Sequence, residues 1–328
     1  MYILTNPTAC WCVGSYQVLV SQLRSTSPEE CQLAATAISK LAAESQSHSD
    51  AIVAAGVLPL LVALLRSAQS AVQEAAAAAL TLLAASSQQN RDAVIAASAV
   101  PLLAALLRSD QYALQRQAAA ALATLAAQSQ QAVIASGALP LLVMLLRSDQ
   151  LAVQMAAAAA LRSCAAGSQG NKDAVVASDA LRHLVLLLRD SSQGSVQEQA
   201  AATLANIASG SEQNKDAVVA VGALPLLVPL LHLDEPLLQM QAVWAIRNIA
   251  SSSQLHRMAA DAAGAIPALT ALSQPGQPGV LQQAAASALH LLGAQGCRCE
   301  TLQPCALAGI NSPQHKTCCS THRCCMGY

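Results

Sequence analysis

The chain has 328 residues, of which 54% are hydrophobic, 11% are charged and 2% are aromatic, with 72 alanines and no phenylalanine. This composition disfavours β-sandwiches and barrels, which need β-branched and aromatic side chains, and it disfavours disorder, which accompanies a shortage of apolar residues. The 17 Lys and Arg residues are balanced by 18 Asp and Glu residues, so the chain lacks the surplus of cations that a nucleic-acid-binding protein needs.

Four apolar runs of 15 residues recur, each with a proline at its ninth place: Ala51–Leu65, Ala93–Leu107, Ala132–Leu146 and Ala217–Leu231. A membrane-spanning helix needs about 18 or more consecutive apolar residues, so we expect segments of a soluble core and no transmembrane segment. The first residues show no cationic region leading into a long apolar stretch. We therefore expect no secretory signal and a cytoplasmic location, with the nucleus as the alternative.

When the sequence is written in rows of about 42 residues, one residue type recurs at the same place of successive rows in three columns. The first column is Pro59, Pro101, Pro140, Arg182, Pro225 and Pro267. The second is Gln73, Gln115, Gln154, Gln197, Gln239 and Gln282. The third is Arg24, Arg66, Arg108, Arg147 and Arg189, followed by His232. Agreement between columns predicts stacked structural repeats, and for the arginines we expect a role at the C-terminal ends of helices, where a cation suits the helix dipole.

Each row of this layout predicts three helices. The first, as in Ala217–Gly222, ends at a glycine suited to the left-handed conformation beyond a helix end, with Ser98 and Asp179 as exceptions in that column. The second begins at a Leu-Pro pair, because proline suits the first turn of a helix. The third, as in Val72–Ser87, is alanine-rich and apolar nearly all round, which is typical of a helix buried between neighbours.

Two rows depart from the period. One lacks, at Gln128–Gln131, the Asn-Arg-Asp found at Asn90–Asp92. We expect this deletion to tighten the junction between a third helix and the next first helix. Another row carries an insertion, Asp190–Ser195, which we expect in an exposed loop.

The layout resembles the armadillo repeat, best over Asn214–Ser251, where Gly222 is followed three residues later by Pro225 and the third helix reads Gln-Ala-Val-Trp-Ala-Ile-Arg-Asn-Ile-Ala. The resemblance covers about residues 14–293, or six to seven rows. In overall style the sequence is similar to algal and plant armadillo proteins and to the vacuole-associated armadillo protein of fungi. It implies an all-α fold, a right-handed armadillo-type solenoid over residues 14–296. Residues 1–13 are then an N-terminal extension and residues 297–328 a Cys-rich tail.

The resemblance also implies a groove lined by the third helices that binds an extended peptide or a partner protein. In that family an Asn holds the peptide backbone and a Trp one turn earlier forms a pocket wall, and only the row at Trp244 and Asn248 has both. The residues expected to line the groove are Asn206, Trp244, Arg247, Asn248, Ser163 and Arg162. The alternatives are that Trp244 fills the core and that the two Asn side chains are surface amides without a ligand.

In the other rows the pairing of Trp with Asn is incomplete. The Asn column otherwise reads Lys40, Leu82, Thr124, Ser163 and Leu291, and alanines occupy most of the Trp column. Importin-alpha-like recognition of basic signals needs several consecutive Trp/Asn pairs, so a nuclear-import adaptor is the disfavoured alternative. A beta-catenin-like groove would be strongly basic, and two arginines do not supply that.

We expect neither an enzyme nor a cofactor, because the sequence has no phosphate-binding loop, no His-Glu-x-x-His and no Gly-x-Ser-x-Gly. Seven of the eleven cysteines lie in the last 32 residues, where Cys318, Cys319, Cys324 and Cys325 fit the spacing of zinc ligands poorly. We expect this tail to be disordered or to extend past the true end of the protein. A metal-binding or lipid-anchored tail on a solenoid spacer is the alternative function. We also expect a monomer, or a fragment of a longer protein.

Overall fold

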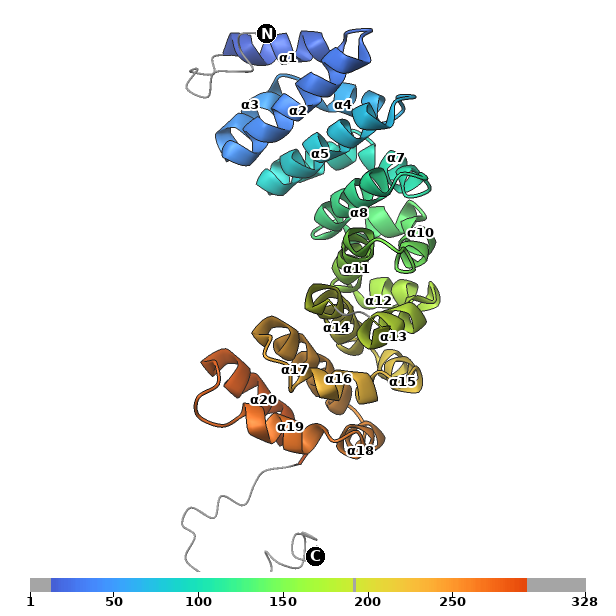
Figure 1. Cartoon of the computed structure of the whole chain (residues 1–328), viewed down its shortest axis with the longest axis vertical. Helices are drawn as coiled ribbons and strands as arrows, with labels where there is room; N and C mark the ends of the chain where they lie inside the picture. The colour runs from blue at the N-terminus through green and yellow to red at the C-terminus, as the bar shows by residue number, and fades with distance from the viewer. Residues whose placement is uncertain (1–12, 191–192, 294–328) are drawn as a thin grey trace, which may run out of the picture. The chain divides into compact units, whose positions relative to one another are not determined.

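The rows of the sequence become sets of helices in the computed structural model, which describes residues 13–190 and 193–293 (Figure 1). The first helices are α3 (Gln46–Ala54), α6 (Gln88–Ala96), α9 (Gln130–Ala135), α12 (Gln169–Ala177), α15 (Glu212–Ala220) and α18 (Gln254–Ala262). The second helices are α1 (Val13–Leu23), α4 (Leu58–Leu64), α7 (Ala99–Leu106), α10 (Ala138–Leu145), α13 (Ala180–Asp190), α16 (Leu224–Leu230) and α19 (Ala265–Leu272). The third helices are α2 (Pro28–Glu44), α5 (Ser70–Ser86), α8 (Tyr112–Ala126), α11 (Leu151–Ala165), α14 (Gly194–Ala208), α17 (Pro236–Ala250) and α20 (Gly279–Leu291).

The first row lacks a first helix within the described residues. All described residues fall in one structural unit, and their regular structure is helical apart from an isolated bridge between Pro275 and Gln277. Each third helix packs on the third helices of the rows before and after it, so the third helices form a continuous layer along one side of the stack (Figure 1). The predicted α-solenoid is confirmed.

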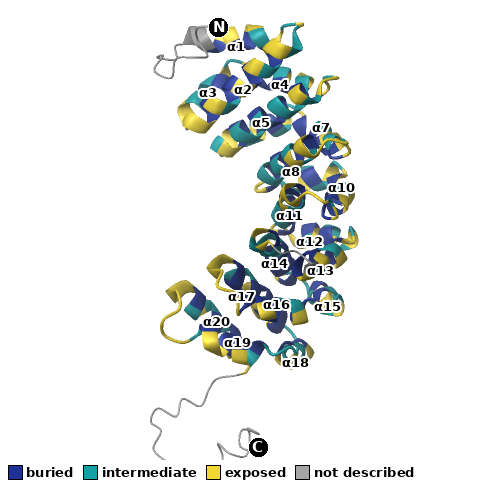
Figure 2. Cartoon of the chain, in the orientation of Figure 1, coloured by how far each residue is buried: buried dark blue, intermediate teal, exposed yellow. Residues whose placement is uncertain are grey.

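Small side chains allow this close stacking. In α8 and α11, alanines such as Ala118, Ala119, Ala157 and Ala158 are completely buried between rows. Figure 2 shows buried residues running through successive rows, with exposed residues along the helix edges. Because an alanine side chain ends at Cβ, neighbouring helices approach closely and bury their apolar faces without large side chains.

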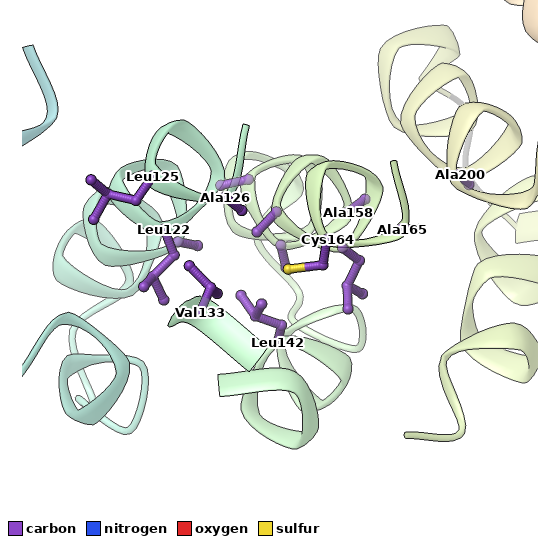
Figure 3. Packing of buried hydrophobic residues seen from close by; sticks show 14 of the residues in the cluster. Leu122, Leu125, Ala126, Val133, Leu142, Ala158, Cys164, Ala165 and Ala200 are labelled. Atoms are coloured by element: carbon purple, nitrogen blue, oxygen red, sulfur yellow. The ribbon is translucent and has the colours of Figure 1, made fainter. Parts of the chain in front are cut away.

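Larger aliphatic side chains complete the core between the helices of a row and its neighbour. Figure 3 shows Leu122 of α8, Val133 of α9, Leu142 of α10 and Cys164 of α11 packed together. None of these four side chains is accessible to solvent. Four helices from two rows therefore share one cluster, and the same arrangement repeats along the stack.

The ends of the first helices adopt the predicted left-handed conformation. Gly222 follows α15 with φ of +78°, and the glycines of that column behave alike. Ser98 and Asp179, the two exceptions in sequence, both have φ of +63°. The turn therefore keeps its geometry without glycine, at the steric cost that a Cβ atom brings to left-handed backbone.

The glutamine column holds the corner between the second and third helices. In each of six rows the side-chain amide donates through Nε2, over 2.6–3.1 Å, to a backbone carbonyl at the end of the second helix or just after it. The pairs are Gln73 with Leu65, Gln115 with Ser109, Gln154 with Ser148, Gln197 with Leu188, Gln239 with Leu231, and Gln282 with Ser273. Carbonyls at a helix C-terminus lack intrahelical partners, so these bonds explain why one residue type recurs here.

The deletion shortens a helix and does not tighten a connection. Helix α9 has 6 residues where α6 and α12 each have 9, while residues 127–129 still separate it from α8. It also loses its N-terminal cap, because Ser129 accepts no side-chain hydrogen bond, whereas Ser87 accepts one from the backbone N–H of Asn90. The expectation of a tighter junction was wrong, because the missing residues came from the first turn of the helix.

No single described helix is long and apolar enough to cross a membrane. One pair, α3 and α4, passes a test of length and composition together, but the two helices are bent by 86° at their connection.

Candidate functional site

The six residues predicted to line the groove lie near the C-terminal ends of three consecutive third helices. Arg162 and Ser163 belong to α11, Asn206 belongs to α14, and α17 carries the remaining three. Since α14 packs against both α11 and α17, the structure brings residues about 40 positions apart in the chain onto one surface. We call this surface, made of Arg162, Ser163, Asn206, Trp244, Arg247 and Asn248, the ladder surface.

The two asparagines of the ladder surface connect neighbouring rows. Asn206 donates through Nδ2 to the backbone carbonyl of Arg162 at 3.0 Å, and Asn248 donates to that of Ala205 at 2.8 Å. Both asparagines therefore link neighbouring rows, and a ligand-binding role for them stays a prediction. Each amide still has a second N–H and an Oδ1 acceptor that form no other hydrogen bond within the described part of the chain.

Trp244 is 43% exposed, so it does not fill the core. It lies one turn before Asn248 on α17, as the sequence predicted. Its equivalents in the two preceding rows are alanines: Ala202 is buried and Ala159 is half-buried. The indole is the one large aromatic side chain on the ladder surface, and its exposed part is available for contact with a ligand.

The arginines of the ladder surface differ in their contacts. Arg247 is exposed and donates through Nε to the Ser287 hydroxyl of α20 at 3.0 Å. The half-buried Arg162 side chain forms no hydrogen bond or ion pair with any described residue. Ser287 was absent from the predicted site, although it occupies the Trp column of the last row and extending that column would have found it.

The remaining predicted member, Ser163, contributes less. Its side chain is half-buried and forms no hydrogen bond to a described residue. Elsewhere in the same column, Thr124 bonds to the carbonyl of Ala120 in its own helix. The inter-row hydrogen bond of this column therefore begins only at Asn206.

A serine, a histidine and an aspartate meet between α15 and α18. The buried His256 lies 2.8 Å from Asp216 through Nε2 and 2.6 Å from the Ser252 hydroxyl through Nδ1. An equivalent group stands between α3 and α6, where Asn90 replaces the histidine and bonds to Asp50 at 2.7 Å and to Ser86 at 3.0 Å. Because asparagine cannot act as a general base, the recurrence identifies both groups as polar clamps between first helices.

Among the described residues, no group of three or more His, Cys, Asp or Glu side chains is placed to hold a metal ion. The cysteines named as weak metal-ligand candidates, Cys318, Cys319, Cys324 and Cys325, lie outside the described residues.

Two hollows lie away from the ladder surface, at the corners between second and third helices. One, of about 370 Å³, is lined by Tyr112, Gln115, Met144 and Arg147 among others. The other, of about 250 Å³, is lined by residues that include Cys31 and Arg66. Cys31 and Arg66 occupy the same row positions as Gln115 and Arg147, so the hollow is a feature of the repeat.

The comparisons with known proteins agree with this architecture. A family model, the Armadillo/beta-catenin-like repeat, matches residues 45–85, 87–127, 128–166, 168–209 and 211–251, which together are more than half of the chain. The chain belongs to the armadillo repeat family. The five matches coincide with the second to sixth rows, each of which has three helices. The family model and the helix bounds therefore divide the chain at the same places.

Solved structures resemble this chain in their three-dimensional fold. An engineered protein from the Northeast Structural Genomics Consortium superposes with a TM-score of 0.81 at 35% identity, covering 84% of this chain and 68% of its own. A designed armadillo repeat protein in complex with the peptide (KR)4 gives a TM-score of 0.68 at 31% identity, covering 72% of this chain and 99% of its own. No curated protein matches the chain. The armadillo fold commonly serves as a protein-binding scaffold.

Proposed function

We propose that the chain is a non-catalytic scaffold that binds an extended segment of a partner protein across α11, α14 and α17. The observation that carries this proposal is the exposed Trp244 beside Asn248, whose amide keeps one N–H and one carbonyl oxygen free. An amide of this kind can donate to and accept from a peptide backbone. Such hydrogen bonds do not depend on the side chains of the peptide. The tryptophan adds a large apolar contact with a preferred orientation.

The designed armadillo repeat protein that forms a complex with a peptide supports the same mode of binding. The likeness covers 99% of that protein and 72% of this chain, so the two chains share the repeated helical fold on which the proposal rests. In this chain the paired Trp and Asn occur in only one row, and we propose that contact is strongest at that row.

The test begins with selection of random linear peptides on the immobilised full-length chain. Their affinities are then measured for the wild type, Trp244→Ala, and the double variant Trp244→Ala with Asn248→Ala. We expect the double variant to bind at least about tenfold more weakly, equivalent to roughly 1.4 kcal/mol. Trp244→Ala alone should show most of the loss, and it is the cleaner variant because Trp244 forms no hydrogen bond within the described part of the chain.

Leu255→Ala is the matched control, because Leu255 is 75% exposed on α18 and lies on a first helix, away from the ladder surface. It should leave the affinity unchanged. Equal affinities of the wild type and the double variant, with the same helical circular dichroism, would show that the peptides bind elsewhere. Failure to select any linear peptide would argue against extended-peptide binding itself.

A further inference from the structure

In six of the seven third helices the C-terminal end carries no carboxylate, and two of these ends carry an arginine. In α5, α8, α11, α14, α17 and α20, the last two turns contain no Asp or Glu. The same turns contain Arg162 on α11, Arg247 on α17 and His290 on α20. The ladder surface therefore lies in a strip where positive charge is not balanced by residues of its own helix turns.

Ion pairing within the chain leaves these cations available. Elsewhere on the third helices, Arg116 of α8 is neutralised by Glu74 of α5 at 3.7 Å. Arg247, in contrast, contacts the neutral hydroxyl of Ser287, and Arg162 has no side-chain partner among the described residues. The half-buried Glu198 lies on α14 about two turns before Asn206 and forms no ion pair with a residue that the structure describes. The helix dipole stabilises a cation at these positions but occupies no guanidinium N–H, and of the N–H groups of Arg162 and Arg247 only the Nε–H of Arg247 is bonded to a described residue.

Each of the two arginines lies next to an asparagine, Arg162 through a hydrogen bond between rows and Arg247 along its own helix. Asn206 bonds to the backbone of Arg162 itself, and Asn248 directly follows Arg247 on α17. Each arginine is thus adjacent to an amide that can hold a peptide backbone. A peptide held by the two amides would place its side chains next to the two guanidinium groups.

We infer that the ladder surface selects an acidic extended peptide, an inference that rests on the proposed function and adds the chemistry of the ligand. Arginine matches a carboxylate with two parallel N–H donors, and such charge-assisted bonds are stronger than neutral ones. Arg162 and Arg247 lie two rows apart, which is about 16–20 Å at ordinary helix spacing. An extended peptide covers that distance in about five or six residues. A peptide with two carboxylates at that separation and an apolar side chain near Trp244 would match the two arginines and the indole.

The inference excludes the ligand class seen with the designed relative. That protein forms a complex with the peptide (KR)4, in which Lys and Arg alternate. On this chain such a peptide would bring its cations toward Arg162 and Arg247, and like charges in contact disfavour binding. The preference for acidic over basic peptides is therefore set by residues visible on this surface.

The experiment uses three labelled peptides of about eight residues, long enough to reach both arginines. They alternate Leu with Glu, with Gln or with Lys, and their affinities for the full-length chain are measured by fluorescence anisotropy. We expect the Glu peptide to bind at least about tenfold more tightly than the Gln peptide, and the Lys peptide to bind most weakly. The advantage of the Glu peptide should shrink between about 0.1 M and 1 M salt, since salt screens exposed charges.

Variants separate a specific contact from the net charge of the protein. Arg162→Gln with Arg247→Gln should lower the affinity for the Glu peptide to that of the Gln peptide and leave the Gln peptide unaffected. Arg108→Gln with Arg147→Gln removes the same net charge at exposed sites outside the ladder surface and should change neither affinity.

Three outcomes are decisive. Equal binding of the Glu and Gln peptides, both weakened by Trp244→Ala, overturns the acidic preference and leaves the peptide-binding groove in place. Equal loss of Glu-peptide affinity in both pairs of arginine variants also overturns the acidic preference, because it shows non-specific attraction. No binding of any of the three peptides, together with selected peptides that ignore Trp244→Ala, overturns both proposals.

Discussion

The side-chain amide of Asn248 donates to the backbone carbonyl of Ala205, 2.8 Å away in the preceding row. The acceptor belongs to the last turn of α14, and the same carbonyl also accepts from the backbone N–H of Ser209 at 3.1 Å. One side chain thus adds a second donor to a carbonyl at a helix end, fixes the position of one row on another, and presents its remaining polar atoms beside Trp244. The candidate site is therefore built into the contact that holds two rows together.

Loss of this bond should be measurable as a loss of stability. We expect Asn248→Ala to lower the free energy of unfolding by about 1 kcal/mol, the usual contribution of one intramolecular hydrogen bond. Urea unfolding followed by far-UV circular dichroism measures the change. Gln241→Ala is the control, since Gln241 lies on the same helix and forms no hydrogen bond through its side chain in the described part of the chain. Similar losses in the two variants would contradict a special role for the inter-row bond.

Two substitutions at the ends of the first helices should change the stability of the chain in opposite directions. A Cβ atom at Gly222 would meet nothing within 4 Å, but φ is +78°, so Gly222→Ala should cost about 1 kcal/mol through backbone strain alone. Ser98 is exposed and already has φ of +63°, so Ser98→Gly should raise stability by up to about 1 kcal/mol. Thermal unfolding of both variants measures the two changes. Destabilisation by Ser98→Gly would show that its side chain matters more than its backbone.

The clamp formed by His256 predicts that asparagine is the best replacement. His256→Ala removes contacts to Asp216 and Ser252 from a buried position and should cost about 2 kcal/mol. His256→Asn restores the residue type that makes the equivalent contacts at Asn90, so it should recover at least half of that loss. Chemical unfolding of the two variants provides the comparison. Equal destabilisation would mean that the shape of the imidazole, and not its hydrogen bonds, holds the position.

Burial of Cys164 predicts a stability that falls at alkaline pH. Desolvation raises the pKa of its thiol from 9.0 to about 12. Below pH 9 the thiol is protonated in the folded and the unfolded chain, and its contribution is fully present. As the pH rises from 9 toward 12, only the unfolded chain loses the proton, so stability falls by up to about 1.4 kcal/mol per pH unit. Cys164→Ala should remove this part of the pH dependence, which urea unfolding at several pH values will measure.

The same pKa shift predicts that Cys164 resists alkylation. Near pH 8 the thiolate fraction of the folded chain should be about a thousandfold below that of an ordinary thiol. Treatment of the native chain with iodoacetamide, followed by peptide mapping, should leave Cys164 unmodified until the chain is unfolded. Rapid native labelling of Cys164 would show that α11 opens readily toward solvent.

Much of the fold was predictable from sequence because its signals are local or repeat at a fixed period. The glycine of Gly222 and the proline of Pro225 mark a helix end and a helix start by backbone chemistry alone. The alanines of α8 and α11 indicate close packing because their side chains are small. Deletion of three residues was visible too, but its effect on α9 was not, because a shorter helix and a shorter loop have the same sequence signature.

What only the tertiary structure decided is how residues in different rows meet. The sequence alone determined the repeat, the three helices of a complete row and the face on which Asn206, Trp244 and Asn248 lie. It did not determine that both asparagines bond to the preceding row, that Glu74 neutralises Arg116, or that Arg162 keeps its charge unpaired. Those contacts depend on the rotation and translation of one row against the next, which arise from the packing of whole helices and leave no mark in the period.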